Sequence, residues 1–87
     1  MKITISDEGK PDWVVDVSES AAKMVRANFN PSMLSEVEVL KHLSGALITM
    51  MEPGKKGGGD KGRCAALAIT NYEQAAMWAV KSATASD

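Results

Sequence analysis

The sequence has few of the residues that hold small domains together by covalent or metal bonds. Its 87 residues include one cysteine, Cys64, and one histidine, His42. A lone cysteine excludes an internal disulfide, and the two residues are too few for a zinc site built from four Cys and His ligands. A domain of this size buries only about 60–65% of its unfolded surface, and small domains without such bonds are commonly stabilised by subunit association. We therefore expect one domain, residues 1–87, that forms a homo-oligomer and holds no metal.

An excess of positive charge and a long hydrophobic run are also missing. Ten Lys and Arg residues against eleven Asp and Glu residues give a net charge of −1, whereas proteins that bind duplex DNA usually carry a basic excess. The longest fully apolar stretches, such as residues 64–69, span about six residues, and a membrane helix needs about 20. No leader-like segment opens the sequence. We expect no duplex nucleic acid partner, no membrane partner and a cytoplasmic location.

Groups suited to catalysis are scarce. General acid–base catalysis needs a positioned histidine or a pair of carboxylates, and His42 has no obvious partner in the sequence. Glu36 and Glu38 are explained by the capping of a helix. Cys64 falls at the start of a helix with no histidine near it in sequence, so its simplest role is that of a small apolar side chain. We expect no catalytic residues, no cofactor and no enzymatic activity.

Residues 1–17 have the pattern of a β-hairpin. Residues 2–6 and 13–17 contain β-branched and aromatic side chains that alternate with polar ones. Residues 7–12 between them include glycine and proline, which suit a turn. We predict an N-terminal β-hairpin extension here. Because a two-stranded hairpin is only marginally stable alone, we expect Trp13 to anchor it on the rest of the molecule.

Two helices are predicted next, with a turn between them. Ser18 can cap a short helix over residues 19–28, and Pro31 disfavours helical backbone at the residue before it. A capping box at residues 35–38, Ser-Glu-Val-Glu, begins the second helix. Apolar residues then recur at helical spacing until residues 52–54, Glu-Pro-Gly, which are predicted to end it.

A long third helix completes the fold. Residues 54–62, with five glycines, are predicted to form a flexible linker, and residues 63–83 are strongly helical. Because two helices joined by a short polar loop pack antiparallel, residues 18–87 are expected to form a helical hairpin region. Apolar residues, many of them alanine, cover the last helix nearly all round, which is typical of a helix buried on more than one side. The predicted fold class is mainly α: an antiparallel helical hairpin with a short leading helix and a small N-terminal β-hairpin, in an oligomer.

The glycine-rich segment does not fit a nucleotide-hydrolase loop. Gly54 and Gly59 have the spacing of a P-loop, but Asp60 stands where that motif needs lysine. Lys61 and Arg63 lie near the start of the long helix, whose free N–H groups favour an anion. Two interpretations stay open: a solvated linker, or an anion-binding site formed by Lys61 and Arg63.

The turn between the first two helices contains the only phenylalanine, Phe29, ahead of Pro31. Its ring could tuck the turn onto the core, or it could be presented for stacking on a base, a contact worth about 1–3 kcal/mol. Lys41 lies about two turns into the next helix, on its polar side. It could pair with a phosphate or remain a solvated lysine.

Several segments resemble a known family. They are Phe29-Asn30-Pro31, the capped helix, Ala66-Leu67-Ala68-Ile69-Thr70 and Glu73-Gln74-Ala75-Ala76-Met77-Trp78-Ala79. Over approximately residues 24–85 the chain resembles the hairpin-domain family of phage anti-defence proteins, the anti-CBASS and anti-Thoeris sponges. The most specific part is the run in the last helix, which is the packing signature of the hairpin.

The resemblance implies a function and a set of site residues. Family members are small helical hairpins that assemble, typically as hexamers, and sequester cyclic-nucleotide immune signals without cleaving them. They often carry an aromatic-His-Pro turn, which is Phe29-Asn30-Pro31 here, and a basic residue on the following helix, which Lys41 matches. The resemblance implies that Phe29 stacks on a base, Asn30 bonds the base edge or sugar, and Lys41 pairs with a phosphate.

Ligand and location follow from the same resemblance. It implies a cyclic di- or trinucleotide or a cyclic ADP-ribose isomer as the ligand, bound in the cytoplasm of the infected bacterial host. Lys61 and Arg63 are candidates for a second pocket, suited to a symmetric cyclic trinucleotide. The alternative is a small helical, oligomeric protein-interaction module that has no nucleotide ligand.

Overall fold

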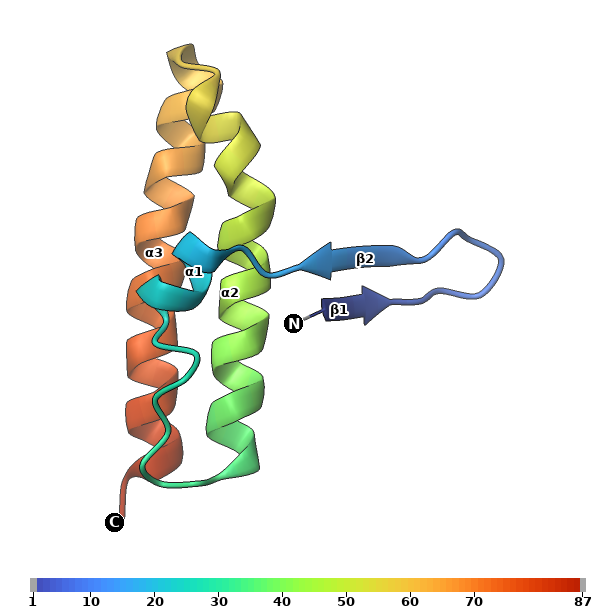
Figure 1. Ribbon diagram of the computed structural model, residues 1–87. Coiled ribbons are helices and arrows are strands. Elements are labelled where there is room, and N and C mark those ends of the chain that lie inside the picture. The colour runs from blue at the N-terminus through green and yellow to red at the C-terminus, as the bar shows by residue number, and fades with distance from the viewer. Residues whose placement is uncertain (1, 87) are drawn as a thin grey trace.

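Three helices and one two-stranded sheet make up the part of the protein that its computed structural model describes, residues 2–86. In chain order the elements are β1 (Lys2–Ile5), β2 (Trp13–Asp16), α1 (Glu19–Met24), α2 (Ser35–Lys56) and α3 (Gly59–Thr84). Figure 1 shows α2 and α3 as an antiparallel pair, with α1 lying across it and the strands projecting sideways. The predicted mainly α fold, with its helical hairpin, leading helix and N-terminal β-hairpin, is confirmed. None of the helices within residues 2–86 is long and apolar enough to span a bilayer.

The core lies where α1 meets the helix pair. Ala21 and Val25 from the α1 segment pack with Ile48 of α2 and with Ile69 and Ala76 of α3, and all five are buried. Burial of a side chain such as Ile48 stabilises the fold by about 1.5–3 kcal/mol. Part of the alanine-rich surface of α3 therefore faces the subunit's own core.

The predicted flexible linker over residues 54–62 is wrong. α2 continues to Lys56, through the proline at position 53, and α3 begins at Gly59. The prediction that residues 52–54 end the helix is therefore also wrong, and the loop consists of two glycines. One of them, Gly58, has φ = +68°, a left-handed conformation that glycine adopts without steric cost.

Close packing of the two helices explains why the glycine-rich segment is helical. A Cβ atom on Gly62 would lie 3.3 Å from the carbonyl oxygen of Lys55, and one on Gly54 would lie 3.4 Å from the Cβ of Ala65. Glycine at these positions lets the ends of α2 and α3 approach each other. The contacts between the two helix ends offset the cost of proline and glycine within them.

The start of α1 is as predicted, whereas its end is not. The Oγ of Ser18 accepts a hydrogen bond from the N–H of Ala21, 3.1 Å away, and so caps the helix. The helix ends at Met24 instead of continuing to residue 28. Arg26 has φ = +53°, a left-handed conformation that interrupts a right-handed helix.

α2 begins without the predicted capping box. Its N-cap is Leu34, whose side chain makes no capping hydrogen bond, and Ser35 is already the first helical residue. The preceding turn supplies the ordering contact instead, because the Nδ2 of Asn30 donates to the carbonyl oxygen of Leu34 at 3.0 Å.

The strands form an antiparallel hairpin, each one residue shorter than predicted. We call residues 2–16, with the turn between the strands, the arm. The expectation that Trp13 anchors it is wrong, because 66% of that residue is exposed. The chain leaves the arm through Val17, which lies against α2 where Gly45 leaves room for it: a Cβ on Gly45 would lie 2.9 Å from the Cγ1 of Val17.

Candidate functional site

The segment between α1 and α2, residues 25–34, is held by hydrogen bonds of its own backbone and side chains. We call it the α1–α2 turn. The N–H of Phe29 donates to the carbonyl oxygen of Arg26 at 2.9 Å, and the N–H of Met33 donates to that of Asn30 at 3.1 Å. The Oδ1 of Asn30 also accepts from the Oγ of Ser32 at 2.6 Å. The amide of Asn30 is thus used inside the turn, next to Pro31.

Lys41 is buried beneath this turn. Only 7% of the residue is exposed, so its predicted place on the polar side of the helix is wrong. Its Nζ donates to the carbonyl oxygen of Arg26 at 3.0 Å and to that of Phe29. Burial, and next the nearby charge of Arg26, lower the pKa of Lys41. Lys41 therefore fixes the shape of the turn from below and adds a positive charge under it.

Phe29 presents its ring at the surface, with 57% of the residue exposed. The ring is not part of the core, and its centroid lies 5.5 Å from the Nζ of Lys41, within the range of a cation–π contact. It borders a surface hollow of about 390 Å³. The residues that line this hollow are Glu19, Ala22, Lys23, Arg26, Ala27, Asn28 and Phe29.

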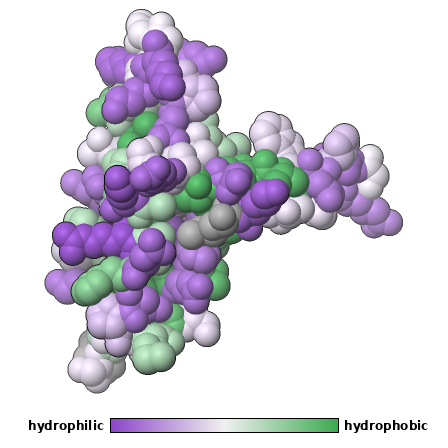
Figure 2. Space-filling model, viewed as in Figure 1, coloured by the Kyte–Doolittle hydropathy of each residue, from purple (hydrophilic) through white to green (hydrophobic). Residues whose placement is uncertain are grey.

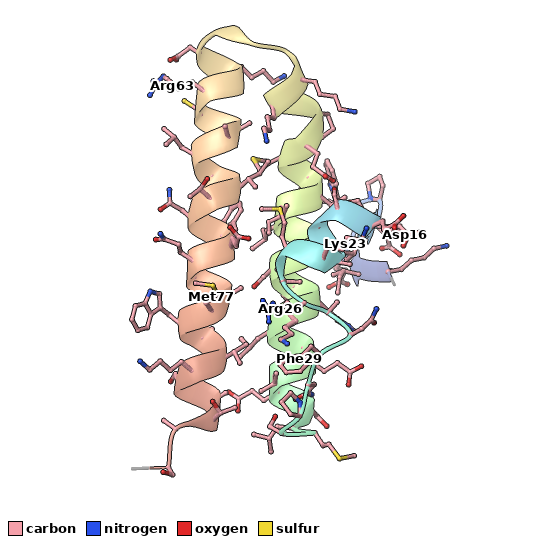
Figure 3. All side chains as sticks on the ribbon, turned by 60° about the vertical axis from the view of Figure 1, so that its left-hand side comes forward. Asp16, Lys23, Arg26, Phe29, Arg63 and Met77 are labelled. Carbon is pink, nitrogen blue, oxygen red and sulfur yellow. The ribbon has the colours of Figure 1, made fainter. Side chains whose placement is uncertain are left out.

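Arg26 is the functional candidate that the sequence analysis missed. It lines the Phe29 hollow and also a second hollow of about 290 Å³, shared with Lys41 and Met77. Figure 3 shows Arg26 and Phe29 next to each other on one side of the helix pair, with Met77 nearby on α3. Within residues 2–86 its guanidinium has no ion pair or hydrogen bond, whereas Lys23 is paired with Glu19 at 3.4 Å. The available signal was an arginine three residues before the aromatic residue, but the helix predicted over residues 19–28 placed it on a helix instead of in the turn.

Lys61 and Arg63 lie apart from the turn. Figure 3 shows Arg63 at the loop end of the helix pair, far along α3 from the height of Phe29. Its guanidinium pairs with Asp60 at 2.8 Å. Lys61 lines a hollow of about 480 Å³, most of whose lining residues are apolar. The predicted site residues therefore form two groups, one at the α1–α2 turn and one at the opposite end.

Among residues 2–86, the remaining titratable side chains do not group into a recognisable catalytic arrangement. The Nε2 of His42 lies 3.9 Å from a carboxylate oxygen of Glu38, one helical turn before it. Within residues 2–86, no cluster of three or more His, Cys, Asp or Glu side chains is placed to hold a metal ion. The turn instead offers an aromatic face beside two positive charges, a combination that suits a base linked to a phosphate.

Comparison with protein-family models gives a match over most of the chain. A family model described as "Acb2/Tad1, hairpin domain" matches residues 22–84. This range contains the α1–α2 turn, α2 and α3, and it leaves out the arm. No curated protein and no solved structure shows a significant match to the chain.

Proposed function

Because the chain belongs to the Acb2/Tad1 hairpin-domain family, we propose that it is a phage anti-defence sponge that binds a cyclic-nucleotide immune signal and holds it without cleaving it. The ligand class is a cyclic di- or trinucleotide or a cyclic ADP-ribose isomer. The place of action is the cytoplasm of the infected bacterial host, where such signals are made. No cofactor is needed, because sequestration requires no chemical step.

One observation carries the proposal within the matched region. The exposed ring of Phe29 and the guanidinium of Arg26 border the same hollow. In the proposed complex Phe29 stacks on a base and Arg26 pairs with a phosphate. Lys41 supports them by holding the carbonyl groups of both residues, and Asn30 and Pro31 shape the turn. We therefore propose that Arg26 pairs with the phosphate in place of Lys41, which is buried.

Thermal unfolding with a panel of ligands tests the proposal. Cyclic dinucleotides, cyclic trinucleotides and cyclic ADP-ribose isomers are each added at increasing concentration. A ligand at 100 times its Kd adds roughly 2.7 kcal/mol of stability per site. Recovery of the intact ligand after heat denaturation distinguishes a sponge from a hydrolase. Absence of a shift with every member of the panel contradicts the proposal.

Replacement of the aromatic ring localises the site. We expect Phe29→Ala to weaken binding by about 1–3 kcal/mol, which is a five- to 150-fold increase in Kd. Because the ring is exposed, the melting temperature without ligand should change little. Phe29→Tyr is the matched control and should keep most of the affinity. Equal losses of stability and of binding would place the ring in a structural role instead.

A second pocket at the loop end stays a prediction. Lys61 and Arg63 lie near the N-terminus of α3, where the helix dipole favours an anion. In a symmetric ring these ends can converge on an axis and suit a symmetric cyclic trinucleotide. Arg63→Ala should then weaken binding of the trinucleotide and leave binding of the dinucleotide unchanged. If calorimetry shows both ligands weakened together, or neither, the loop end is not a separate site.

The alternative function is a protein-interaction module without a nucleotide ligand. Large apolar side chains are exposed on both long helices, among them Leu43, Leu47, Leu67, Met77 and Trp78. In the favoured proposal this surface is covered by other copies of the chain in a homo-oligomer, a hexamer by analogy with the family. The ligand panel separates the two functions, and light scattering coupled to size-exclusion chromatography gives the oligomeric state.

A further inference from the structure

The arm carries a continuous apolar face that reaches past the rest of its subunit. Ile3 pairs with Val15 and Ile5 pairs with Trp13 across the two strands, so these four side chains share one face of the hairpin. The first pair is half-buried, whereas Ile5 and Trp13 are 60% and 66% exposed. Figure 1 shows the strands running sideways from α2, with the turn between them at the far tip. The half of the face nearer the tip is thus left without cover by its own chain.

Such an arm needs more support than its own subunit provides. A two-stranded hairpin is at best marginally stable in water. A tryptophan presents roughly 150–250 Å² for burial, and here two thirds of that residue is open to solvent. Within the described chain no third strand joins the sheet, because β1 and β2 pair only with each other. The exposed half of the apolar face is therefore open to contact with another surface.

The charges at the tip of the arm indicate which surface the arm contacts. The tip, residues 7–12, contains three carboxylates and one lysine, a net charge of −2, and Lys10 pairs with Asp7 at 3.5 Å. The loop end of the helix pair, residues 52–63, has a net charge of +2. Within the described part of the chain, Lys55 and Lys56 have no ion-pair partner. The acidic tip and the basic helix end are complementary.

The distance between apolar and charged groups along the arm is also compatible with the distance between such groups along α2. On the arm, Trp13 and Glu8 are at most about 17 Å apart along the strand, at 3.3 Å per residue. On α2, Leu47 and Lys55 are about 12 Å apart along the helix, at 1.5 Å per residue, and about 80° apart around it. Leu47 is 42% exposed. Figure 2 shows hydrophobic side chains at the base of the arm and hydrophilic ones toward its tip, and hydrophilic side chains also gather at the loop end of the helices.

We infer that the arm binds a second copy of this chain. Trp13 and Ile5 cover exposed apolar side chains on the neighbour's α2, near Leu47, and Glu8 and Asp12 meet the neighbour's Lys55. The arm of a subunit does not meet the basic end of the same subunit, because it projects sideways from the middle of the helix pair (Figure 1). A two-fold arrangement makes the contact reciprocal, so each copy gives an arm and receives one. This interface is additional to the ligand site and lies outside the family match at residues 22–84.

Directed cross-linking tests the contact with the full chain. Cys64 is exposed and lines a hollow with Gly54, beside the end of α2. The variant Glu8→Cys in a Cys64→Ser background is mixed with unaltered protein and oxidised with diamide. A disulfide between position 8 and Cys64 then joins two different chains, and mass spectrometry of the linked peptide identifies it. Ser86→Cys in the same background is the control, because it places the thiol beyond the opposite end of α3.

The expected result is at least tenfold more disulfide from position 8 than from position 86. High salt should reduce that yield, because the tip contact is electrostatic. Asp12→Cys is the second arm variant, in case the first alters the turn. If both arm positions give no more product than position 86, the inference is wrong. Ligand binding measured on the same samples is independent of this outcome.

Charge reversal supplies a second test. Asp12→Lys and Lys55→Glu should each weaken association by about tenfold in sedimentation experiments, because each places like charges together. Combining them restores opposite charges across the interface and should recover most of the affinity. Loss of association in the combined variant, with circular dichroism showing that the helices are intact, would contradict the contact.

Discussion

At the scale of single residues, the α1–α2 turn is held in a strained conformation that places a cation beside an aromatic ring. Arg26 adopts φ = +53°, which costs a non-glycine residue roughly 1–2 kcal/mol. Lys41 stabilises this conformation by donating to the carbonyl oxygens of Arg26 and Phe29. Strain of this kind commonly marks functional sites. The strain at position 26 is consistent with an arginine that acts through its guanidinium, because its backbone conformation would suit glycine better.

The variant Arg26→Gly separates the role of the guanidinium from the cost of the left-handed backbone. Glycine accepts a left-handed backbone, so we expect the melting temperature to stay the same or to rise. Loss of a charge-assisted hydrogen bond of about 1.5–3 kcal/mol should meanwhile raise the Kd for a cyclic dinucleotide by more than tenfold. Calorimetry and thermal unfolding on one preparation measure both. Arg26→Gly with unchanged affinity would remove Arg26 from the proposed site.

The sequence predicts only part of this site. Phe29 was identified because an aromatic residue in a turn before proline has no helical face to pack on. Arg26 was missed because its left-handed backbone depends on Lys41, which lies fifteen residues later in the chain. The burial of Lys41 was equally hidden, since a long lysine side chain can lie beneath a turn as readily as it can extend into water.

At the scale of elements, a cluster of polar groups ties α1 to α2. The N–H of Ser18 donates to the Oγ1 of Thr49 at 3.0 Å, and the Oγ of Ser20 donates to the Oε2 of Glu52 at 2.5 Å. Hydrogen bonding by the hydroxyls of Ser18 and Ser20 lowers the pKa of Glu52 below its usual 4.5. The helix that leads into the α1–α2 turn is thus fixed to α2 by a charged group.

The lowered pKa of Glu52 gives a pH dependence with a definite sign. The unfolded chain binds a proton at higher pH than the folded one does. The stabilisation is therefore complete above the unfolded value of 4.5 and is lost as the pH falls through the lower folded value. We expect Glu52→Gln to cost about 1 kcal/mol at neutral pH, which is about 4–8 °C in melting temperature. Melting curves from neutral pH to about pH 3 should show this difference vanish on the acid side.

The control for Glu52 is Glu73→Gln, which removes a carboxylate from α3 outside this cluster. It should not reproduce the loss at neutral pH. If Glu52→Gln and the unaltered protein melt together at neutral pH, the cluster does not stabilise α1.

The contact between Val17, which follows the arm, and Gly45 of α2 can be tested by a double-mutant cycle. Because a Cβ on Gly45 would lie 2.9 Å from the Cγ1 of Val17, Gly45→Ala should cost about 1–3 kcal/mol by overpacking, in spite of its better helix propensity. Val17→Ala removes the clashing atoms. The double variant should be more stable than the sum of the single effects by at least about 1 kcal/mol. Urea unfolding measures all four proteins, and strict additivity would mean that Val17 moves away freely.

The fold was largely predictable because apolar residues repeat with helical and strand periods. Those repeats located both long helices and the two strands. The ends of the elements were harder to predict, since a glycine can either form part of a loop or allow two helices to pack closely. The sequence alone does not distinguish a loop glycine from one such as Gly62, where two helices touch. The start of α2 was also hard to predict, because the side chain of Asn30 donates to the carbonyl oxygen of Leu34 and no side chain caps the first N–H groups of the helix.

At the scale of the whole molecule, one subunit leaves much apolar surface open. Leu43, Leu47 and Met50 are 44%, 42% and 43% exposed, and their spacing of four and three residues places them along one side of α2. Trp78 on α3 is 65% exposed, with the Nζ of Lys81 5.1 Å from its ring centroid. Contiguous apolar patches of this kind mark association sites. Leu47 lies in the part of this surface that a neighbour's arm is inferred to cover, whereas Leu43 lies one turn further from the basic end of α2 and tests the remainder.

Leu43→Glu tests whether this surface joins subunits. About half of the leucine side chain remains to be buried, worth roughly 1 kcal/mol, and burying a carboxylate in its place costs several more. A two-fold interface contains the substitution twice. We expect light scattering at micromolar concentration to show a smaller assembly for Leu43→Glu, while circular dichroism remains that of the folded subunit. Two control variants should assemble normally. Leu43→Met exchanges one apolar side chain for another at the same position, and Thr70→Glu places a charge at an exposed polar position on α3. If the unaltered chain is a 9.2 kDa monomer in solution, the apolar surface of α2 does not join copies of the chain. That result would favour the alternative function, a protein-interaction module, over the homo-oligomer.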